Sequence, residues 1–369
     1  MIKTTNSKAK RVWFITDTHL GVKNNSNEWI EIMREYFFEW FIPLVRKNYQ
    51  PGDVLIHLGD VYDSRQSINI KVLNLGVDLF EELSSIFSDG IYVIAGNHDL
   101  WGKTSNDINS LKSLKWIPNV NILEEPETII FGDKKFMMMP WRRDHNSEIE
   151  TLDSTNYHDV LCCHADIRGL KFNRYVNVDT GADISKFEKF QRVYSGHIHY
   201  SQKTGNIRML GSPYEITRSD MDNKKSITLL NLENMEEKIF INDFSPRYIK
   251  IYFSDLLEKT PDDLELIFRN NFVDIMIDPD LSLRSPLSII TDIMTCQRSI
   301  KFHPYDSNKT TSLSSRMIDS DGDGSFNVMD FIKSFVQGME NDDEEKNKII
   351  SGLNKLYNIV ITREEDKKL

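Results

Sequence analysis

The sequence predicts an α/β fold, and two observations support this prediction. Short apolar runs typical of buried strands alternate with segments of helical periodicity between residues 11 and 119. Each apolar run also ends in a polar loop. Strand, loop, helix and strand in this order build parallel sheets, because the helix returns the chain to the end of the sheet where the next strand begins.

Three strands and two helices account for this first part of the chain. We expect the strands at "RVWFIT" (11–16), "DVLIHL" (53–58) and "GIYVIA" (90–95). Apolar residues at spacings of three and four predict an amphipathic helix in each interval, although Gly76 weakens the second by about 1 kcal/mol. The first helix would bury Ile30, Met33, Phe37, Trp40, Phe41 and Leu44, and the second Val72, Leu75, Leu79, Leu83 and Ile86.

After residue 119 the pattern changes to short strands with few long helices between them. A second α/β unit begins near Pro246, with strands at 247–253, 273–277 and 299–303 and helices near 261–270 and 286–297. We therefore expect domains at 1–245 and 246–305, an acidic linker at 306–327 and a helical region at 328–369. The short strands of the first domain are "ETIIF", "KFMMMP", "DVLCC", "RVYS", "IRML", "SITLLN" and "KIFIN".

Composition favours a soluble globular protein located in a reducing compartment. The chain has 369 residues, of which 40% are hydrophobic and 27% charged. No apolar stretch approaches the roughly 18 residues of a membrane-spanning helix, and the N-terminus lacks the apolar region of a signal peptide. Cys162, Cys163 and Cys296 form neither a disulfide framework nor a zinc-binding spacing. We expect a cytoplasmic location, the host cytoplasm if the protein is phage-encoded, and no membrane partner.

The net charge of −11 does not exclude a nucleic-acid substrate. Residues 319–345 contain nine acidic side chains and one lysine, so this segment alone carries −8 of that charge. The remainder of the chain is nearly neutral and contains basic clusters. Bound cations can also supply positive charge at a phosphate-binding site.

Metal-capable side chains follow five separate strand-like runs. The pair of histidines in "YSGHIHYS" (194–201) is ambiguous alone, because an ordinary strand end can carry two polar residues. The carboxyl ends of strands in an α/β sheet meet at one rim, however, and five coincidences there indicate a site. The side chains are Asp17 and His19, then Asp60, then Asn97, His98 and Asp99, then His164, and finally His197 and His199.

This set resembles the motif series of the calcineurin-like metallophosphoesterases. Its elements D-x-H, G-D, G-N-H-D/E, H and G-H-x-H stand in order as "DTHLG", "GDVYD", "AGNHD", "CCHAD" and "SGHIH", within residues 11–245. The resemblance implies a four-layer αββα sandwich that holds two divalent metal ions. By similarity, one ion would be bound by Asp17, His19, Asp60 and His199, and the other by Asp60, Asn97, His164 and His197.

Physical chemistry is consistent with these implied roles. A carboxylate has two oxygens and can bridge two ions, which suits Asp60 to the shared position. The mixed nitrogen and oxygen ligand set favours Mn, with Fe, Zn or Mg as alternatives. His98 is expected to protonate the leaving oxygen or to stabilise the transition state, with Asp99 fixing its tautomer.

Further segments resemble the SbcD-type DNA repair nucleases, including the recombination endonuclease subunits of T-even bacteriophages. These segments are "MMMPWRRD" and "MLGSPYEITR", and "GDVYDSR" and "GNHD" differ from the "GDxVDRG" and "GNHE" of protein Ser/Thr phosphatases. The resemblance implies a small α/β capping domain at 246–305, and Mn-dependent 3′-to-5′ exonuclease and single-strand endonuclease activity on DNA. One departure is Asp63, where some relatives have histidine.

The same resemblance implies partners. An SbcC-type coiled-coil ATPase would bind the helical region at 328–369, and a homodimer would form through helices that include the Val72–Ile86 face. Packing of that face against the sheet is the alternative. Candidate contacts to the DNA backbone, for which solvated surface is the alternative, are Arg142, Arg143, Lys171, Arg174 and Arg218.

Two other functions stay open for the chain, and one segment has two interpretations. The functions are a nucleotide phosphodiesterase or phosphatase with the same metals, and a non-catalytic subunit that binds DNA or a partner. The segment "DSDGDGSFNVMD" matches much of a calcium loop, but its last position is aspartate instead of glutamate and no good helix precedes it. A flexible acidic linker is the preferred interpretation; the calcium ligands would be Asp319, Asp321, Asp323 and Asp330.

Overall fold

The computed structural model describes residues 4–101, 108–142, 145–155, 158–276 and 300–303. The chain divides into two compact units, Met1–Ser245 and Pro246–Leu369. Several predictions lie outside the described residues: the helix near 286–297, the linker at 306–327, the helical region at 328–369, Arg143, and the calcium loop with Asp319, Asp321, Asp323 and Asp330.

Two sheets form the centre of the first unit. The six-stranded sheet has the order β15-β14-β2-β3-β4-β5, and the seven-stranded sheet β1-β6-β7-β8-β11-β13-β12. The first contains β15 (Glu237–Ile241), β14 (Ser226–Asn231), β2 (Arg11–Ile15), β3 (Asp53–His57), β4 (Ile91–Ile94) and β5 (Val120–Leu123). The second contains β1 (Thr4–Ser7), β6 (Glu127–Phe131), β7 (Lys134–Met139), β8 (Val160–His164), β11 (Arg192–Gly196), β13 (Ile207–Met209) and β12 (Gln202–Thr204).

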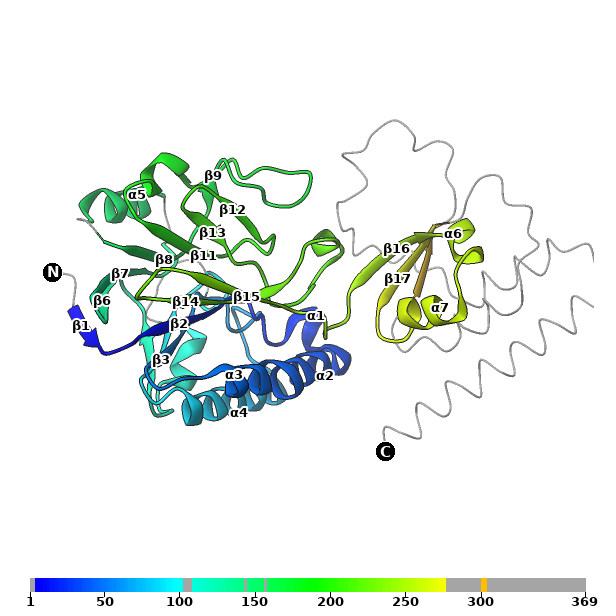
Figure 1. Ribbon diagram of the computed structural model, residues 1–369, viewed down its shortest axis with the longest axis horizontal. Coiled ribbons are helices and arrows are strands. Elements are labelled where there is room, and N and C mark those ends of the chain that lie inside the picture. The colour runs from blue at the N-terminus through cyan, green and yellow to red at the C-terminus, as the bar shows by residue number, and fades with distance from the viewer. Residues whose placement is uncertain (1–3, 102–107, 143–144, 156–157, 277–299, 304–369) are drawn as a thin grey trace, which may run out of the picture. The chain divides into compact units, whose positions relative to one another are not determined.

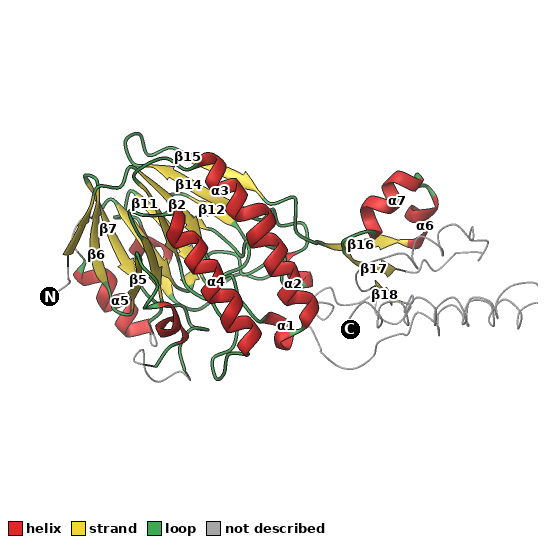
Figure 2. Ribbon diagram, turned by 90° about the horizontal axis from the view of Figure 1, so that it is seen from below, coloured by secondary structure: helices red, strands yellow, loops and turns green. Residues whose placement is uncertain are grey.

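The two sheets pack face to face around one apolar core. Phe14 of β2 stacks on Tyr194 of β11 with ring centroids 4.2 Å apart, and both side chains are buried. Helices cover the outer faces, so that every residue of β3 is buried, as expected for a strand covered on both sides. Figures 1 and 2 show α2, α3 and α4 against the six-stranded sheet and α5 on the seven-stranded sheet. The predicted four-layer αββα sandwich is confirmed.

The helices of this unit are short except for one. They are α1 (Val22–Asn25), α2 (Asn27–Glu35), α3 (Ile42–Asn48), α4 (Ile70–Ile86) and α5 (His145–Ser154). Single turns of 3₁₀ helix lie at η2 (Ser110–Leu114), η3 (Ile184–Phe187) and η4 (Arg218–Asp220). A two-stranded sheet pairs β9 (Ile167–Arg168) with β10 (Ala182–Asp183).

The first predicted helix contains a π-helical segment that the apolar pattern did not predict. Between α2 and α3 the chain forms η1 (Tyr36–Phe41), a π-helix. A π-turn holds more residues than an α-turn, and the buried face therefore shifts along the sequence. Val45 is buried as a result, whereas Trp40 and Leu44, expected in the core, are only half-buried. Ile30, which lies in α2 before the π-helix, is also only half-buried, so its expected place in the core was wrong as well.

The second predicted helix is α4, and its apolar stripe packs inside the unit. Val72, Leu75, Leu79 and Leu83 are all buried. The expectation that this stripe forms a dimer interface is therefore wrong for these four residues, because they already pack within their own chain. The presence of glycine at position 76 of this helix is also explained, because a Cβ there would lie 2.3 Å from the Tyr62 hydroxyl oxygen.

The second unit is a small α/β structure in the part that the structure describes. Its parallel sheet has the order β16-β17-β18, formed by β16 (Tyr248–Tyr252), β17 (Phe272–Met276) and β18 (Ile300–His303). Helices α6 (Phe253–Leu257) and α7 (Pro261–Phe268) connect β16 to β17. Thr260 and Asp263 form a capping box that begins α7. Leu264 and Phe268 then pack on Val273 of the sheet.

A charged group links the two sheets of the first unit and predicts a pH-dependent stability. Glu237 of β15 accepts hydrogen bonds from Tyr194 at 2.8 Å and from Arg208 at 2.6 Å. Burial alone would raise the pKa of Glu237, but the hydrogen bonds from Arg208 and Tyr194 lower it from 4.5 to about 2. The carboxylate therefore stabilises the fold above pH 4.5, and this contribution is lost as the pH falls towards 2.

We expect Glu237→Gln to lower the free energy of unfolding by about 2 kcal/mol at pH 7. The difference from the wild type should shrink as the pH falls below the ordinary glutamate value. Urea unfolding at pH 7, 4 and 3 measures it, with Glu233→Gln on the adjacent exposed turn as the control. A constant difference at all three pH values would contradict the assignment.

Candidate metal centre

The ends of five strands bring the predicted ligands together. In the six-stranded sheet, β2 leads to Asp17 and His19, β3 to Asp60, and β4 to Asn97. In the seven-stranded sheet, β8 ends at His164, and the loop after β11 carries His197 and His199. Asp17, His19, Asp60 and His164 are buried, whereas Asn97, His197 and His199 are partly exposed. The site therefore lies where the carboxyl ends of strands from both sheets meet.

The backbone turns sharply where the strands end. Asp17, His19, Asp60 and His197 have left-handed conformations with φ of 50°, 43°, 55° and 88°. Such conformations cost about 1–3 kcal/mol each in a residue that has a Cβ, and they persist where surrounding structure imposes them. The loop that carries Asp60 packs closely against Gly96, where a Cβ would lie 2.2 Å from Asp60 Oδ1.

The side chains form two groups that meet at Asp60. Asp17, His19 and His199 place one potential ligand atom each within 4.8 Å of one another, and Asp60, His164 and His197 do the same. Asp60 Oδ2 lies 3.6 Å from His19 Nε2 in the first group and 3.4 Å from His164 Nε2 in the second. Asn97 Oδ1 lies 2.8 Å from His197 Nδ1 and joins the second group.

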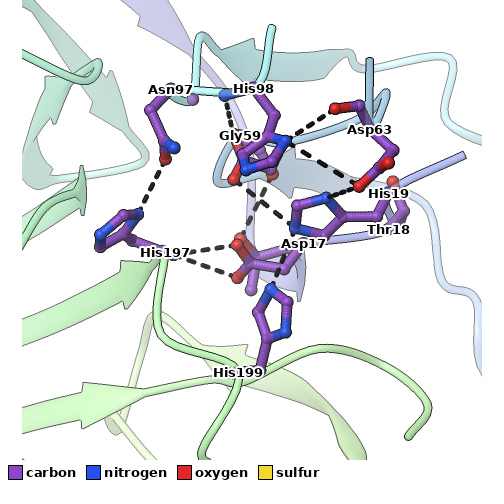
Figure 3. Close-up of polar contacts among 12 residues, drawn as sticks. Asp17, Thr18, His19, Gly59, Asp63, Asn97, His98, His197 and His199 are labelled. Atoms are coloured by element: carbon purple, nitrogen blue, oxygen red, sulfur yellow. Dashed lines mark hydrogen bonds and ion pairs between the residues drawn. The ribbon is translucent and has the colours of Figure 1, made fainter. Parts of the chain in front are cut away.

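His197 and His199 belong to different groups, although they are only two residues apart. Figure 3 shows His197 beside Asn97, and His199 reaching towards Asp17 and His19. His199 Nε2 lies 3.0 Å from His19 Nε2. On an extended strand the two side chains would point the same way, but the positive φ of His197 ends the extended conformation.

Three histidines donate their outer nitrogen to an acceptor outside the centre. His19 Nδ1 donates to Asp63 at 3.0 Å, His164 Nδ1 to the Leu58 carbonyl at 2.7 Å, and His197 Nε2 to Asp166 at 3.0 Å. Carboxylate and carbonyl oxygens can only accept, which fixes these tautomers. Each ring, once neutral, then presents a lone pair to the interior, as metal-binding histidines do. The residues therefore fit a pair of metal ions.

The amide of Asn97 has two orientations in this environment. In one, its oxygen joins the inward-facing lone pairs of His164 and His197. In the other, its nitrogen donates to both rings and its oxygen accepts from Arg65 Nη2 at 2.7 Å. Hydrogen bonding to the protein alone favours the second orientation, whereas a bound cation would favour the first, because it needs the oxygen.

A comparison with protein families decides the assignment. Residues 10–201 match the family described as calcineurin-like phosphoesterases, which is more than half of the chain. The chain belongs to this family.

The individual proteins that resemble this chain have low sequence identity to it. This phosphoesterase is 26% identical over 230 residues to exonuclease subunit 1 of enterobacteria phage T4, an alignment that covers 62% of this chain and 66% of that protein. It therefore spans slightly less than two thirds of the length of that relative. Among solved structures, an archaeal phosphodiesterase is 16% identical with a TM-score of 0.34, covering 63% of this chain and 99% of its own. A protein of unknown function from Aquifex aeolicus is 18% identical with a TM-score of 0.25, covering 49% and 93%.

Electrostatic interactions keep the central carboxylate of the phosphoesterase ionised. Burial alone would raise the pKa of Asp60, but His164 and His19 hold it well below its usual range. Burial lowers the pKa of His199 to about 4, with His19 adding to the effect, so this ring is neutral at pH 7 and can act as a ligand. Burial alone would lower the pKa values of His19 and His164, but Asp63 and Asp60 raise that of His19 to about 8, and Asp60 raises that of His164 to about 9. Both rings are therefore protonated at pH 7 when no cation is bound, and a divalent cation must displace these protons to use their nitrogens.

Asp99 does not contact His98 in the way that the sequence suggested. Its side chain is buried, and its two oxygens accept the backbone N–H groups of Asp60, Val61, Tyr62 and Gly96 at 2.8–3.2 Å. The expectation that Asp99 fixes the His98 tautomer is therefore wrong. His98 Nδ1 instead donates to the Asp63 carbonyl at 2.7 Å. Asp99 supports the loop that carries Asp60.

We expect Asp99→Asn to destabilise the phosphoesterase by about 3 kcal/mol, because one amide oxygen cannot satisfy four buried N–H donors. The loss should appear as a lower thermal midpoint and as weaker binding of Mn²⁺ by the folded protein. Asp159→Asn is a less buried aspartate control that also accepts a backbone N–H, from Lys135 at 2.8 Å. Unchanged stability of Asp99→Asn would contradict the supporting role.

The sequence did not identify the residues that orient the ligands. Asp63 was noted only as a departure from relatives, yet it accepts from His19, and its carboxylate oxygen lies 3.9 Å from His98. Asp166, two residues after His164, accepts from His197. Arg65 reaches Asn97 in one amide orientation. Acidic residues just after metal motifs are a usable signal for such partners, because imidazole ligands need an outer acceptor.

A buried ion pair between Lys225 and Asp220 fixes the position of the segment "LGSPYEITRSD" (210–220). Lys225 Nζ donates to Asp220 at 2.7 Å, to Ser212 at 3.1 Å and to the carbonyl of His199 at 2.7 Å. Both charged groups are buried. Nearby, Tyr214 donates its hydroxyl to the Thr18 carbonyl. The segment therefore holds the loops that carry His199 and the Asp17–His19 pair.

The described candidate DNA contacts lie on three segments. Arg142 follows Trp141, whose ring lies 4.7 Å from that of His197, and it pairs with Glu125. Lys171 and Arg174 lie on the loop after β9, where Arg174 pairs with Asp222 at 3.1 Å. Arg218 begins η4, next to the residues that line a small cavity beside His197 and His199.

None of the helices in the described residues is both long and apolar enough to cross a membrane.

Proposed function

We propose that this phosphoesterase is the nuclease subunit of a DNA recombination or repair complex and hydrolyses phosphodiester bonds with two divalent metal ions. The observation that carries the proposal is the position of the Asp60 carboxylate between two groups of inward-facing imidazole nitrogens. Its similarity to exonuclease subunit 1 of phage T4 supports DNA as the substrate. We propose 3′-to-5′ exonuclease activity on duplex DNA and endonuclease activity on single strands.

The residues divide into two ligand sets that share one carboxylate. Asp17, His19, Asp60 and His199 would hold one ion, and Asp60, Asn97, His164 and His197 the other. Two such cations would supply a hydroxide nucleophile near neutral pH and would stabilise negative charge on the phosphate. The mixture of imidazole nitrogens and oxygens favours Mn over Mg, with Fe and Zn as alternatives.

His98 is the group available to act on the substrate. Its side chain is 31% exposed, and its backbone N–H donates to Asp60 Oδ1 at 2.7 Å, which places the ring at the edge of the centre. With Nδ1 donating to the Asp63 carbonyl, Nε2 is directed away from that contact. A ring held in this way can deliver a proton to the leaving oxygen or stabilise charge on the phosphoryl group.

The partners and the location follow from the same family likeness. We propose that an SbcC-type ATPase works with this subunit in the cytoplasm, the host cytoplasm if the protein is phage-encoded. We also propose that the subunit forms a homodimer. Arg142, Lys171, Arg174 and Arg218 would contact the DNA backbone without reading its sequence.

Incubation of end-labelled duplex and single-stranded DNA with Mn²⁺, with and without the ATPase partner, tests the proposal. We expect mononucleotides from the 3′ end of duplex DNA and internal cuts in circular single strands. Hydrolysis of nucleotide phosphodiesters or phosphomonoesters without any cleavage of DNA would overturn the proposal in favour of a nucleotide phosphodiesterase or phosphatase. No hydrolysis of any phosphoester would instead favour a non-catalytic subunit.

A further inference from the structure

The loop between β9 and β10 exposes three large apolar side chains close to the candidate metal centre. Phe172, Tyr175 and Val176 are 53%, 63% and 51% exposed. Figure 1 shows the chain after β9 extending away from the seven-stranded sheet. Single exposed apolar residues are common on protein surfaces, but three within five positions form a patch that indicates binding.

The loop is an ordered hairpin. Val178 donates its N–H to the Leu170 carbonyl at 2.8 Å, and both of these side chains are buried in the core at the base of the hairpin. At the tip, the Asn173 side chain accepts the N–H groups of Tyr175 and Val176 at 2.8 and 2.9 Å. The aromatic rings are therefore presented to solvent on a fixed backbone, so that little conformational entropy is lost when they bind a ligand.

The hairpin is also joined to the strand next to the ligand loop. Gln202 of β12 accepts the N–H of Lys171 at 3.0 Å and donates to its carbonyl at 2.6 Å. A cavity of about 70 Å³ lies between the hairpin and the centre. It is lined by Phe172, Asn173, His197, His199, Tyr200, Ser219 and Asp220. Phe172 therefore lines the same cavity as His197 and His199, two of the predicted metal ligands.

The chemistry of the patch matches unpaired nucleotides. Lys171 and Arg174 are interleaved with the two aromatic residues, and the Arg174 guanidinium lies 5.9 Å from the centroid of the Tyr175 ring. Aromatic rings bind nucleobases by stacking, while neighbouring cations bind the phosphates that link them. A base offers its face to a protein ring only when it is unstacked from its neighbours, which a paired duplex interior does not allow.

We propose that the hairpin at 170–178 is a stacking platform for unpaired bases of the strand that enters the metal centre. The inference rests on the proposed nuclease function and specifies its substrate: a single strand, or a duplex end that has frayed next to the scissile phosphate. Phe172 and Tyr175 stack on the bases, and Lys171 and Arg174 contact the backbone.

The test measures binding of a single-stranded oligonucleotide that contains 2-aminopurine, in the presence of EDTA so that it is not cleaved. The double variant Phe172→Ala, Tyr175→Ala should raise the Kd at least about tenfold and abolish the quenching that stacking causes, with a smaller change for a blunt duplex. The ring-preserving variant Phe172→Tyr, Tyr175→Phe should bind as the wild type does. Trp116→Ala, which removes an aromatic residue that is 87% exposed elsewhere, is the control for surface change.

The outcomes separate this inference from the function on which it rests. If the wild type cleaves DNA but the double alanine variant binds single strands normally, the platform is wrong and the nuclease proposal stands. An equal loss of affinity for single strands and duplex also overturns the platform, because stacking requires unpaired bases. If the wild type neither cleaves nor binds DNA, the nuclease proposal itself fails, and a patch that binds a partner protein instead would explain the exposed rings.

Discussion

Replacement of Asp60 by asparagine is expected to abolish binding of both metal ions and to reduce DNA hydrolysis by a factor on the order of 10³ or more. The asparagine keeps the size of the side chain and one oxygen, which can still accept the His98 N–H now bonded at 2.7 Å. It removes the charge and the second oxygen, Oδ2, which lies 3.6 Å from His19 Nε2 and 3.4 Å from His164 Nε2. A neutral amide can serve at most one of the two groups.

Calorimetry with Mn²⁺ and metal analysis of the dialysed protein provide the measurements. The control is Asp133→Asn, since the side chain of Asp133 is 81% exposed in the turn after β6 and its only described ion pair is with the adjacent Lys134. An Asp60→Asn protein that retained two ions and degraded DNA at the wild-type rate would show that the carboxylate does not bridge a dinuclear centre.

The sequence predicted which residues meet, because strand ends are encoded locally. An apolar run followed by Asp, Asn or His can be recognised without knowing the fold, and an α/β order then brings such ends to one rim. The same reasoning predicted β2, β3 and β4 to within a residue or two. It also predicted the stripe of α4, where an uninterrupted period of 3.6 residues identifies the buried face.

Interactions that depend on the path of a loop could not be predicted in this way. Asp99 is adjacent to His98 in sequence, yet its carboxylate points into the loop of Asp60, since neighbouring side chains in a turn diverge. The hydrogen bond from His19 to Asp63 and the contact between Lys225 and the His199 carbonyl join residues 44 and 26 positions apart. The π-helix at η1 has no local signal in an aromatic-rich stretch, so Trp40 and Leu44 were wrongly expected in the core.

Replacement of His98 by glutamine is expected to leave metal binding nearly unchanged and to reduce turnover by about 10²–10⁴-fold. His98 lies at the edge of the centre, and its ring hydrogen bond goes to the Asp63 carbonyl. Its side chain is 31% exposed, whereas that of His164 is fully buried, so a substrate can reach the first ring and not the second. Glutamine can keep a donor near Asp63 but cannot transfer a proton at neutral pH.

Metal content, Mn²⁺ affinity and single-turnover cleavage of labelled DNA should be measured on the same preparation. His158→Gln is the matched control, because His158 precedes β8 at the end opposite to His164 and bonds Thr128 at 2.9 Å, a contact that glutamine can preserve. The ring of His98 also belongs to a group with His19 and Asp60 whose ligand atoms lie within 4.8 Å of one another. A parallel loss of metal and turnover in His98→Gln would therefore make His98 a metal ligand. Loss of turnover with full metal content assigns the ring to the substrate, because both ions are then in place and only the proton-transferring side chain has been removed.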